Sequence, residues 1–183
     1  FTKTSCGTNS SNSNISYPNS FQVNVTANNP CGESSVSVVP IYVSTPPKAG
    51  LSAQSSTCVN SDFYVTNTST SGYVVNNNSC EEGDKFIWTV SPSTGVTTTR
   101  GTSLGDTYGL PDEQYNSWNS GSRELYLKFQ YPGNYTIKIK VVNRCGTSDT
   151  TQTICVEPVV TPSFTLDKNK GCAPFTVKVN NTT

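Results

Sequence analysis

One pattern occurs twice in the chain at a fixed interval. The stretch YPNSFQVNVTANNPCGES at residues 17–34 is matched by YPGNYTIKIKVVNRCGTS at residues 131–148, a separation of 131 − 17 = 114 residues. Cys58 and Cys172 are also 172 − 58 = 114 residues apart. Several landmarks at one offset indicate an internal repeat, which predicts a tandem array of similar units.

The repeat predicts where the units begin and end. We expect residues 1–44 to be the C-terminal part of one repeat, residues 45–158 a complete repeat, and residues 159–183 the N-terminal part of a further one. A unit of about 114 residues is large enough to bury its own core. We therefore expect this sequence to be a segment of a longer array.

Period-two alternation of apolar residues predicts β-strands. Tyr135, Ile137, Ile139 and Val141 alternate with residues that would face solvent. Similar patterns lie at 21–27, 63–69, 86–90, 125–130, 149–157 and 175–182. The pattern at 86–90 predicts that Trp88 faces the core. The only helical signal is PDEQYNSW (111–118), where Pro suits the first helical position. Many short strands separated by turns predict an all-β fold, an antiparallel β-sandwich.

Charge and cysteine content limit the environment and the partners. Twelve basic residues balance twelve acidic ones without a run of Lys or Arg, so we expect neither nucleic acid nor an anionic membrane as a partner. No segment is apolar enough for direct membrane insertion. Seven cysteines without any histidine favour disulfides in an oxidising, extracellular compartment over a zinc site.

Three motifs carry a family resemblance. FIWTVSP (86–92), YPGNYTIKIKVVNRCG (131–146) and GCAPFTVKVNN (171–181) together resemble PKD-like domains of bacterial surface proteins. The nearest resemblance is to arrays in large adhesins of Bacteroidota, including gliding-motility adhesins exported by the type IX secretion system. It implies tandem immunoglobulin-like (PKD-like) antiparallel β-sandwiches. The better-known PKD form has an Asp and a Gly-Asp-Gly run where this chain has residues 89–91 (Thr-Val-Ser), so no role of those acidic residues is carried over.

Four cysteines within residues 45–158 allow three sets of pairings. If the strands run alternately up and down, Cys80 and Cys145 fall at one end of the sandwich and Cys58 and Cys155 at the other. Only cysteines at the same end can come within bonding distance. We therefore predict the disulfides Cys80–Cys145 and Cys58–Cys155.

The remaining cysteines lie outside the complete repeat. We predict that Cys6 pairs with Cys31, and that Cys172 has its partner beyond residue 183. The alternative is that one or two cysteines stay as buried free thiols.

The residues for catalysis are missing, so we expect no enzyme activity. Histidine is absent, and neither Gly-x-Ser-x-Gly nor Ser-x-x-Lys occurs. No cofactor is expected. Glu81, Glu82 and Asp84 surround a glycine and are candidates for calcium, since hard cations take several carboxylate oxygens. The alternative is a solvated acidic loop.

Two further features are candidate sites. The long insert at residues 101–122 carries Tyr108, Tyr115 and Trp118, whose rings would stack on sugars or contact a protein partner, unless the insert folds back and buries Trp118. Asp149–Thr151 resembles the short O-glycosylation motif of Bacteroidota, which makes Thr150 a glycosylation candidate.

These observations give one main hypothesis and one alternative. The main one is a structural repeat segment of a secreted cell-surface adhesin, acting as a rigid extended stalk in surface adhesion or gliding motility. Its partners would be neighbouring repeats and, beyond them, a surface polysaccharide or a component of the secretion or motility machinery. The alternative is a carbohydrate-binding or accessory module of an extracellular enzyme that degrades polysaccharide or protein.

Overall fold

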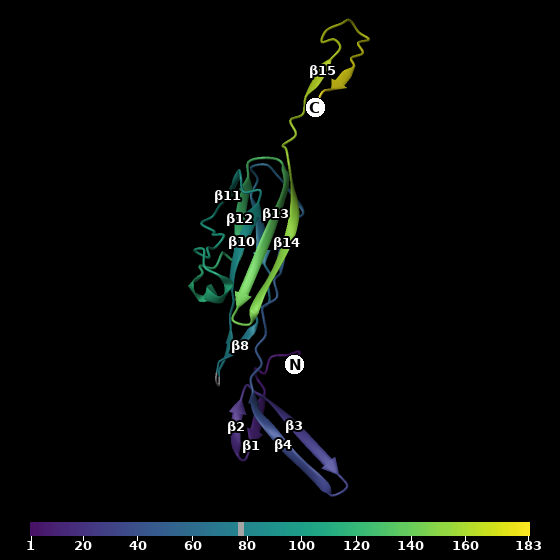
Figure 1. Ribbon diagram of the computed structural model, residues 1–183. Helices are drawn as coiled ribbons and strands as arrows, with labels where there is room; N and C mark the ends of the chain where they lie inside the picture. Colours follow the sequence, from purple (N-terminus) through teal and green to yellow (C-terminus); the bar gives the residue numbers. More distant parts are fainter. Residues whose placement is uncertain (77–78) are drawn as a thin grey trace.

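The structure, a computed structural model, describes residues 1–76 and 79–183. Three β-rich units follow one another along an elongated molecule: an N-terminal pair of hairpins, a central sandwich and a C-terminal hairpin (Figure 1). The described residues contain one helical segment, the 3-10 helix η1 (Asp112–Ser117), at the predicted place. The predicted all-β fold is confirmed.

Two four-stranded sheets form the central unit. One has the strand order β11-β12-β7-β5 and the other β10-β13-β14-β6. The first consists of β5 (Leu51–Ala53), β7 (Phe63–Asn67), β11 (Val96–Thr98) and β12 (Glu124–Phe129). The second consists of β6 (Ser56–Cys58), β10 (Lys85–Ser91), β13 (Gly133–Asn143) and β14 (Gly146–Glu157). Paired strands are antiparallel, except that β6 runs parallel to β14. In chain order, the letters A to G fall on β5, β7, β10, β11, β12, β13 and β14. The two sheets then have the A-B-E-D and C-F-G strand orders of immunoglobulin-like sandwiches, with β6 added beside strand G.

Period-two alternation explains how the two sheets share one core. The buried core residues are Phe63, Val65, Trp88, Val90, Leu125, Leu127, Phe129, Tyr135, Ile137, Ile139, Val141, Ile154 and Val156. As predicted from the alternation, Trp88 is buried, and its Nε1 donates a hydrogen bond to the carbonyl of Ser122 at 2.9 Å. Tyr135, at the start of β13, donates from its hydroxyl to the carbonyl of Tyr131 at 3.0 Å. Such a tyrosine beside the E–F corner is a known feature of these sandwiches.

The N-terminal unit has two hairpins, β1 (Asn9–Asn12) with β2 (Ile15–Pro18) and β3 (Phe21–Asn29) with β4 (Gly32–Ile41). The β3–β4 hairpin has the register of β13–β14 shifted by 114 residues. Val25 lies opposite Val36 in the first, as Ile139 lies opposite Thr150 in the second.

The central sandwich meets the N-terminal unit through a hairpin of its own. β8 (Tyr73–Asn76) and β9 (Ser79–Glu82) form this hairpin between β7 and β10. The segment after β4 runs beside β8: Thr45 N donates to the carbonyl of Tyr73 at 2.8 Å, and Val75 N donates to Ser44 Oγ at 2.9 Å. These bonds fix the direction in which the chain enters the sandwich.

The C-terminal unit is a single hairpin of β15 (Phe164–Leu166) and β16 (Val179–Asn181). Every residue from 157 to 183 is exposed. Within the described part of the chain, residues 158–162 form no hydrogen bond with either neighbouring unit. The hairpin therefore extends from the sandwich without packing on it (Figure 1).

Candidate functional site

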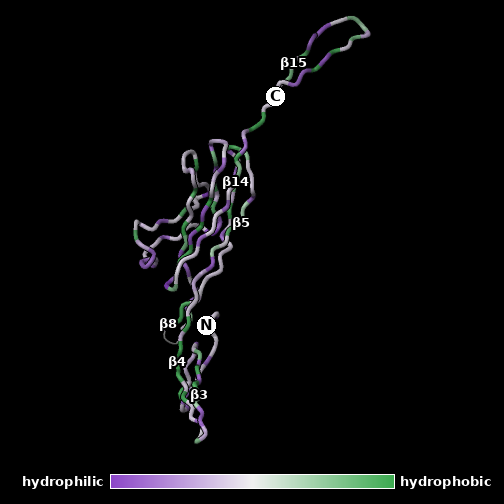
Figure 2. The backbone as a smooth tube through the Cα atoms, turned by 45° about the vertical axis from the view of Figure 1, so that its right-hand side comes forward, coloured by the Kyte–Doolittle hydropathy of each residue, from purple (hydrophilic) through white to green (hydrophobic). Residues whose placement is uncertain are grey.

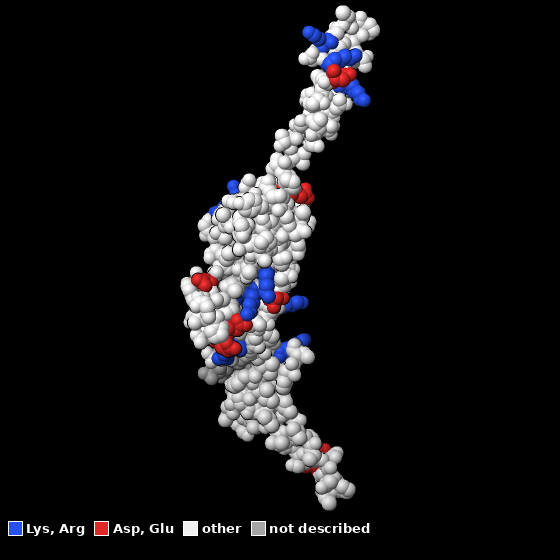
Figure 3. All heavy atoms as spheres, turned by 45° about the horizontal axis from the view of Figure 1, so that its top comes forward, with Lys and Arg blue, Asp and Glu red and all other residues white. Residues whose placement is uncertain are grey.

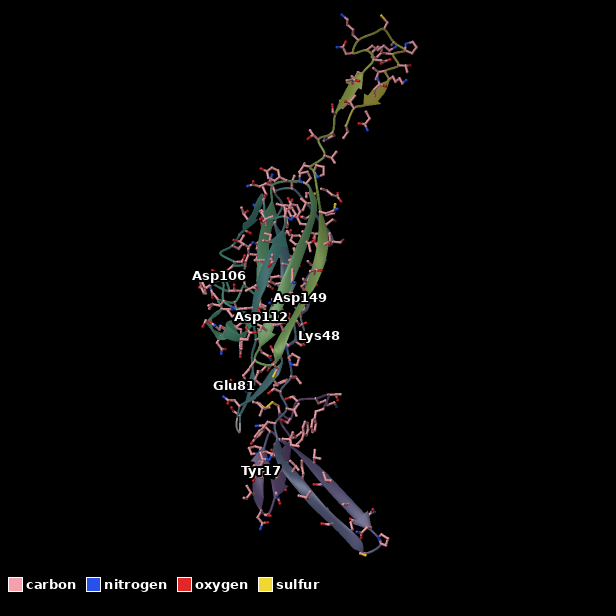
Figure 4. All side chains as sticks on the ribbon, viewed as in Figure 1. Tyr17, Lys48, Glu81, Asp106, Asp112 and Asp149 are labelled. Carbon is pink, nitrogen blue, oxygen red and sulfur yellow. A yellow bond between two sulfur atoms is a disulfide. The ribbon has the colours of Figure 1, made fainter. Side chains whose placement is uncertain are left out.

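The long insert lies against the outer face of the second sheet. Its helix η1 packs on β13, where Lys140 Nζ is 2.7 Å from Asp112 Oδ1. Pro111 precedes η1, and Asp112 and Glu113 occupy its first turn, where carboxylates interact favourably with the free backbone N–H groups. Asp112 is labelled beside β13 in Figure 4, and Figure 3 shows charged side chains on this middle unit and on the C-terminal unit of an otherwise largely uncharged surface.

Trp118 is not available for ligand contact. It is 3 % exposed, and the Lys140 ammonium lies 5.8 Å from the centre of its ring. The expectation that Trp118 stacks on a sugar is therefore wrong, and the alternative, that the insert folds back and buries it, is correct. Its Nε1 has no hydrogen-bond partner among the described residues.

The other two insert aromatics differ in exposure. Tyr108 is 63 % exposed at a position of positive φ, where its backbone N–H donates to Asp106 Oδ1 at 2.7 Å in an Asx-type turn. Tyr115 is half-buried and lies between two surface hollows. Of the three predicted residues, Tyr115 is the one placed in a concave, polar setting.

The first hollow has a volume of about 560 Å³ and lies between η1 and the β13–β14 turn. Asp112, Glu113, Tyr115, Asn143 and Arg144 contribute to its wall. Several of these groups are bonded within the protein: Asn143 donates to the carbonyl of Thr45 and accepts from Cys145 N, and Asp112 pairs with Lys140. Arg144 donates to the carbonyl of Val75, so these side chains also hold the wall of the hollow together.

The second hollow, of about 180 Å³, is lined in part by the predicted calcium candidates Glu81, Glu82 and Asp84 and by Tyr115. Glu81 is labelled on the β8–β9 hairpin in Figure 4. Because Glu81 and Glu82 are neighbours on β9, their side chains point to opposite faces of the hairpin. Asp84 Oδ1 accepts a hydrogen bond from Ser71 Oγ at 3.2 Å. Among the described residues, no three acidic, cysteine or histidine side chains lie close enough together to bind a metal ion. The structure therefore shows no set of ligands for the calcium ion that the sequence suggested.

A disulfide joins the N-terminal unit to the central sandwich. Cys6 is bonded to Cys80, with 5.8 Å between the Cα atoms, whereas Cys31 and Cys145 are exposed free thiols. The predicted pairs Cys80–Cys145 and Cys6–Cys31 are therefore wrong. The physical reason is that Cys80 lies on the β8–β9 hairpin, which projects beyond the sandwich to the segment holding Cys6.

The predicted pair Cys58–Cys155 is not formed either, and both residues are exposed thiols. In the parallel β6–β14 ladder Cys155 lies opposite Ser56 and Cys58 lies opposite Glu157. The two cysteines are thus diagonal neighbours on the outer face of one sheet. The prediction placed them at the correct end of the sandwich and was wrong about the bond. Cys172, in the C-terminal unit, is also an exposed thiol.

Thr150 lies on the inner face of its strand. It is half-buried and directly opposite Ile139, which is fully buried, because paired residues of an antiparallel ladder share a face. Its neighbour Asp149 faces outward and forms an ion pair with Lys138 at 2.9 Å. This orientation disfavours Thr150 as a glycosylation site.

Sequence reasoning missed a polar aromatic cluster on the outer face of the first sheet. Tyr64 and Tyr126 lie opposite each other on β7 and β12 with ring centres 5.9 Å apart, and Arg100 covers Tyr126 at 4.4 Å. Arg100 and Lys128 both contact Asp62, at 3.1 and 3.3 Å. The signal was present in the outward positions of FYVTN and ELYLKF, which both hold tyrosine.

Comparison with known proteins identifies no family for this chain. No protein-family model matches the chain, and no similar curated protein is found. Among the described residues, no helix has the length and apolar character needed to cross a bilayer.

Proposed function

We propose that this chain is a structural repeat segment of a large secreted cell-surface adhesin. Its PKD-like, immunoglobulin-like sandwiches would act as a rigid extended stalk in surface adhesion or gliding motility. The observation that carries the proposal is the end-to-end arrangement of three β units with a fixed joint between the first two (Figure 1). The resemblance of the sequence motifs to adhesin arrays supplies the biological context.

The shared register of two hairpins supports the tandem-repeat part of the proposal. β3–β4 and β13–β14 have the same turn position and the same cross-strand partners at an offset of 114 residues, up to the irregularity between Phe21 and Val23. Their ladders end in matching pairs, Asn29 with Gly32 and Asn143 with Gly146. Similar sequences that form similar hairpins are what a repeated domain requires.

The joint between the first two units supports the rigid part. The Cys6–Cys80 bond and the hydrogen bonds of Thr45 and Val75 to their neighbours act at the same junction. A covalent link and a short ladder of backbone bonds together restrict bending there. A stalk needs this kind of restriction, because a freely bending connector would let the units collapse onto one another.

Small-angle X-ray scattering of the dilute monomer tests the stalk. A compact globule of 183 residues would have a radius of gyration of about 16 Å. β4 and β14, with 10 and 12 residues, alone give about 75 Å of strand length. A rod of that length has a radius of gyration of about 75/√12, or about 22 Å, so we expect a value above about 22 Å for the whole molecule. A value close to that of a globule would contradict the proposal.

A second candidate function is carbohydrate binding at the hollows beside Tyr115. The supporting observation is an aromatic side chain set between two polar walls, one of them lined by Asp112, Glu113 and Arg144. Binding of the wild-type chain to a glycan array that is lost in Tyr115→Ala and kept in Tyr108→Ala would support it. An array without any reproducible signal would contradict it.

A further inference from the structure

Two tyrosine rings lie side by side on the outer face of the first sheet. The residues on either side of Tyr64 in β7 and of Tyr126 in β12 are buried, so the period of two turns both tyrosines away from the core. Figure 2 shows this change between hydrophobic and hydrophilic residues along the strands of the central unit. The ring centres are 5.9 Å apart, the ring planes are 35° apart, and Tyr64 is 52 % exposed. The pair forms an aromatic surface that is open to solvent.

Charged neighbours hold the Tyr126 ring in position. Its hydroxyl donates to Glu124 Oε2 at 3.2 Å, and the central carbon of the Arg100 guanidinium lies 4.4 Å from the ring centre. Asp62 in turn contacts both Arg100 and Lys128. The polar aromatic cluster consists of Asp62, Tyr64, Arg100, Tyr126 and Lys128. A surface that is held in place before a ligand arrives loses less conformational entropy on binding.

The backbone at Arg100 is unusual for an arginine. Its φ is +57°, in the left-handed region that favours glycine. Hydrogen bonds tie this turn to β12: Thr99 N donates to the carbonyl of Tyr126 at 2.9 Å, and Tyr126 N donates to Thr102 Oγ1 at 3.1 Å. The chain thus keeps a long cationic side chain over the Tyr126 ring at a position where glycine is less strained. Strained positions of this kind concentrate at functional sites.

The tyrosine of β7 is not a requirement of the repeated fold. At the offset of 114 residues Val65 corresponds to Val179, so the inward residue is the same in both units. Tyr64, the outward neighbour of Val65, corresponds to Lys178. The aromatic surface is therefore a feature of the central unit, and the packing of the core does not explain it.

The other outward positions of the sheet indicate which class of partner fits. The strand registers place hydroxyl or charged side chains there, namely Ser52, Thr66, Thr97, Glu124 and Lys128. None of the outward positions in these four strands holds an aliphatic residue. Because the core of a protein–protein interface is depleted in charged residues, this face suits a hydroxyl-rich partner better than a protein.

The charges of the face balance. Arg100 and Lys128 carry two positive charges, and Asp62 and Glu124 carry two negative ones. Without an excess of positive charge the face does not attract an acidic polymer. The outer face of a sheet is also open, so it contacts a ligand from one side and leaves room for a chain that continues in both directions.

We propose that the polar aromatic cluster binds a neutral polysaccharide. The C–H face of a sugar ring stacks on Tyr64, and the groups around the two rings exchange hydrogen bonds with the sugar hydroxyls. This inference deepens the proposed adhesin function, on which it rests for the setting, by giving the chemical class of the partner. The site is separate from the hollows beside Tyr115, since helix η1 lies against the second sheet and the cluster lies on the first.

A polysaccharide microarray probed with the 183-residue chain tests the proposal. It carries neutral chains (cellulose, xylan, mannan and α-glucan), acidic chains (alginate and hyaluronate) and spots of albumin. The wild type should bind at least one neutral chain and none of the acidic ones. Tyr64→Ala should weaken this binding at least about tenfold, because the stacking ring is lost. Tyr64→Phe keeps the ring and should bind within about threefold of the wild type.

Three further variants sharpen the result. Arg100→Gly suits the backbone at this turn, removes the guanidinium from the Tyr126 ring, and should weaken binding. The matched control Tyr108→Ala makes the same change at an exposed tyrosine of the insert and should bind like the wild type. Tyr115→Ala should keep the binding that Tyr64→Ala loses. Trp88 fluorescence and circular dichroism confirm that each variant keeps the folded sandwich.

Several outcomes would overturn the proposal. They are a wild type that binds no neutral chain, binding confined to the acidic chains or to albumin, and loss of binding in Tyr115→Ala but not in Tyr64→Ala. Scattering reports the shape of the molecule and the array reports its contact with sugar, so the stalk and this site can fail independently.

Discussion

Ile139 lies on β13, an inner strand of the second sheet, between Trp88 on one side and Thr150 on the other. Its side chain is fully buried, so shortening it leaves a cavity that the two sheets can close only in part. We expect Ile139→Ala to lower the free energy of unfolding by about 2–5 kcal/mol, measured by chemical denaturation. Thr151→Ala, on the outer face of β14, should change it by less than about 0.5 kcal/mol. Equal effects of the two variants would contradict the core assignment.

Asp62 gives the protein an acid-sensitive contact. The hydrogen bonds from Arg100 and then from Lys128 hold the pKa of Asp62 below its ordinary value. A lowered pKa in the folded state means that the contact stabilises the protein above the unfolded-state pKa of about 3.9, and that this stabilisation is lost as pH falls through the folded-state pKa.

The melting temperature of the wild type should therefore fall below about pH 4, and Asp62→Asn should show a shallower fall. Because the three side chains are about half exposed, the effect is small and sensitive to salt. In about 1 M salt the two proteins should give the same profile. Identical acid profiles at low salt would show that the contact has no effect on stability.

Among the elements, the insert depends on one contact between η1 and β13. We expect Lys140→Met to remove the ion pair with Asp112 and the ammonium beside the Trp118 ring, and so to loosen the insert while the sandwich stays folded. Since both groups are about one-third exposed, the loss of stability should be below about 1 kcal/mol. Amide hydrogen exchange should rise within residues 111–118 and stay unchanged in β12. Lys138→Met, which removes the pair with Asp149, is the matched control. Faster exchange throughout the sandwich would contradict a local role.

Elements whose signal is local could be predicted from the sequence. The alternation in β13 and β10 and the proline before η1 gave strands, a core tryptophan and a helical turn at the correct residues. Cysteine positions at the two ends of the sandwich were also predicted correctly. The disulfide partner of Cys80 was predicted wrongly, and the burial of Trp118 was left as an alternative. Both depend on the direction in which a projecting segment, the β8–β9 hairpin or the 101–122 insert, folds, and no local sequence pattern encodes this direction.

The Cys6–Cys80 disulfide determines which residues bear the force when the whole molecule is stretched. When force is applied at residues 1 and 183, the Cys6–Cys80 bond takes residues 7–79 out of the path, and β6 is not pulled away from β14. Unfolding the sandwich then releases the chain from Cys80 to Glu157, 157 − 80 = 77 residues, or about 27 nm. After reduction the released chain runs from Leu51 to Glu157, 157 − 51 = 106 residues, or about 37 nm.

Single-molecule force spectroscopy measures this difference of about 10 nm directly. Cys80→Ser should give the longer step with and without reductant. One step length for the wild type under both conditions would show that the bond is not in the load path.

Residues 158–162 make the two junctions between the units mechanically different. At the first junction the Cys6–Cys80 bond and backbone hydrogen bonds oppose bending, whereas at the second the restricted backbone of Pro158 and Pro162 is what opposes it. Under a sideways load the two junctions should therefore deflect by different amounts, and the one without cross-links should deflect first.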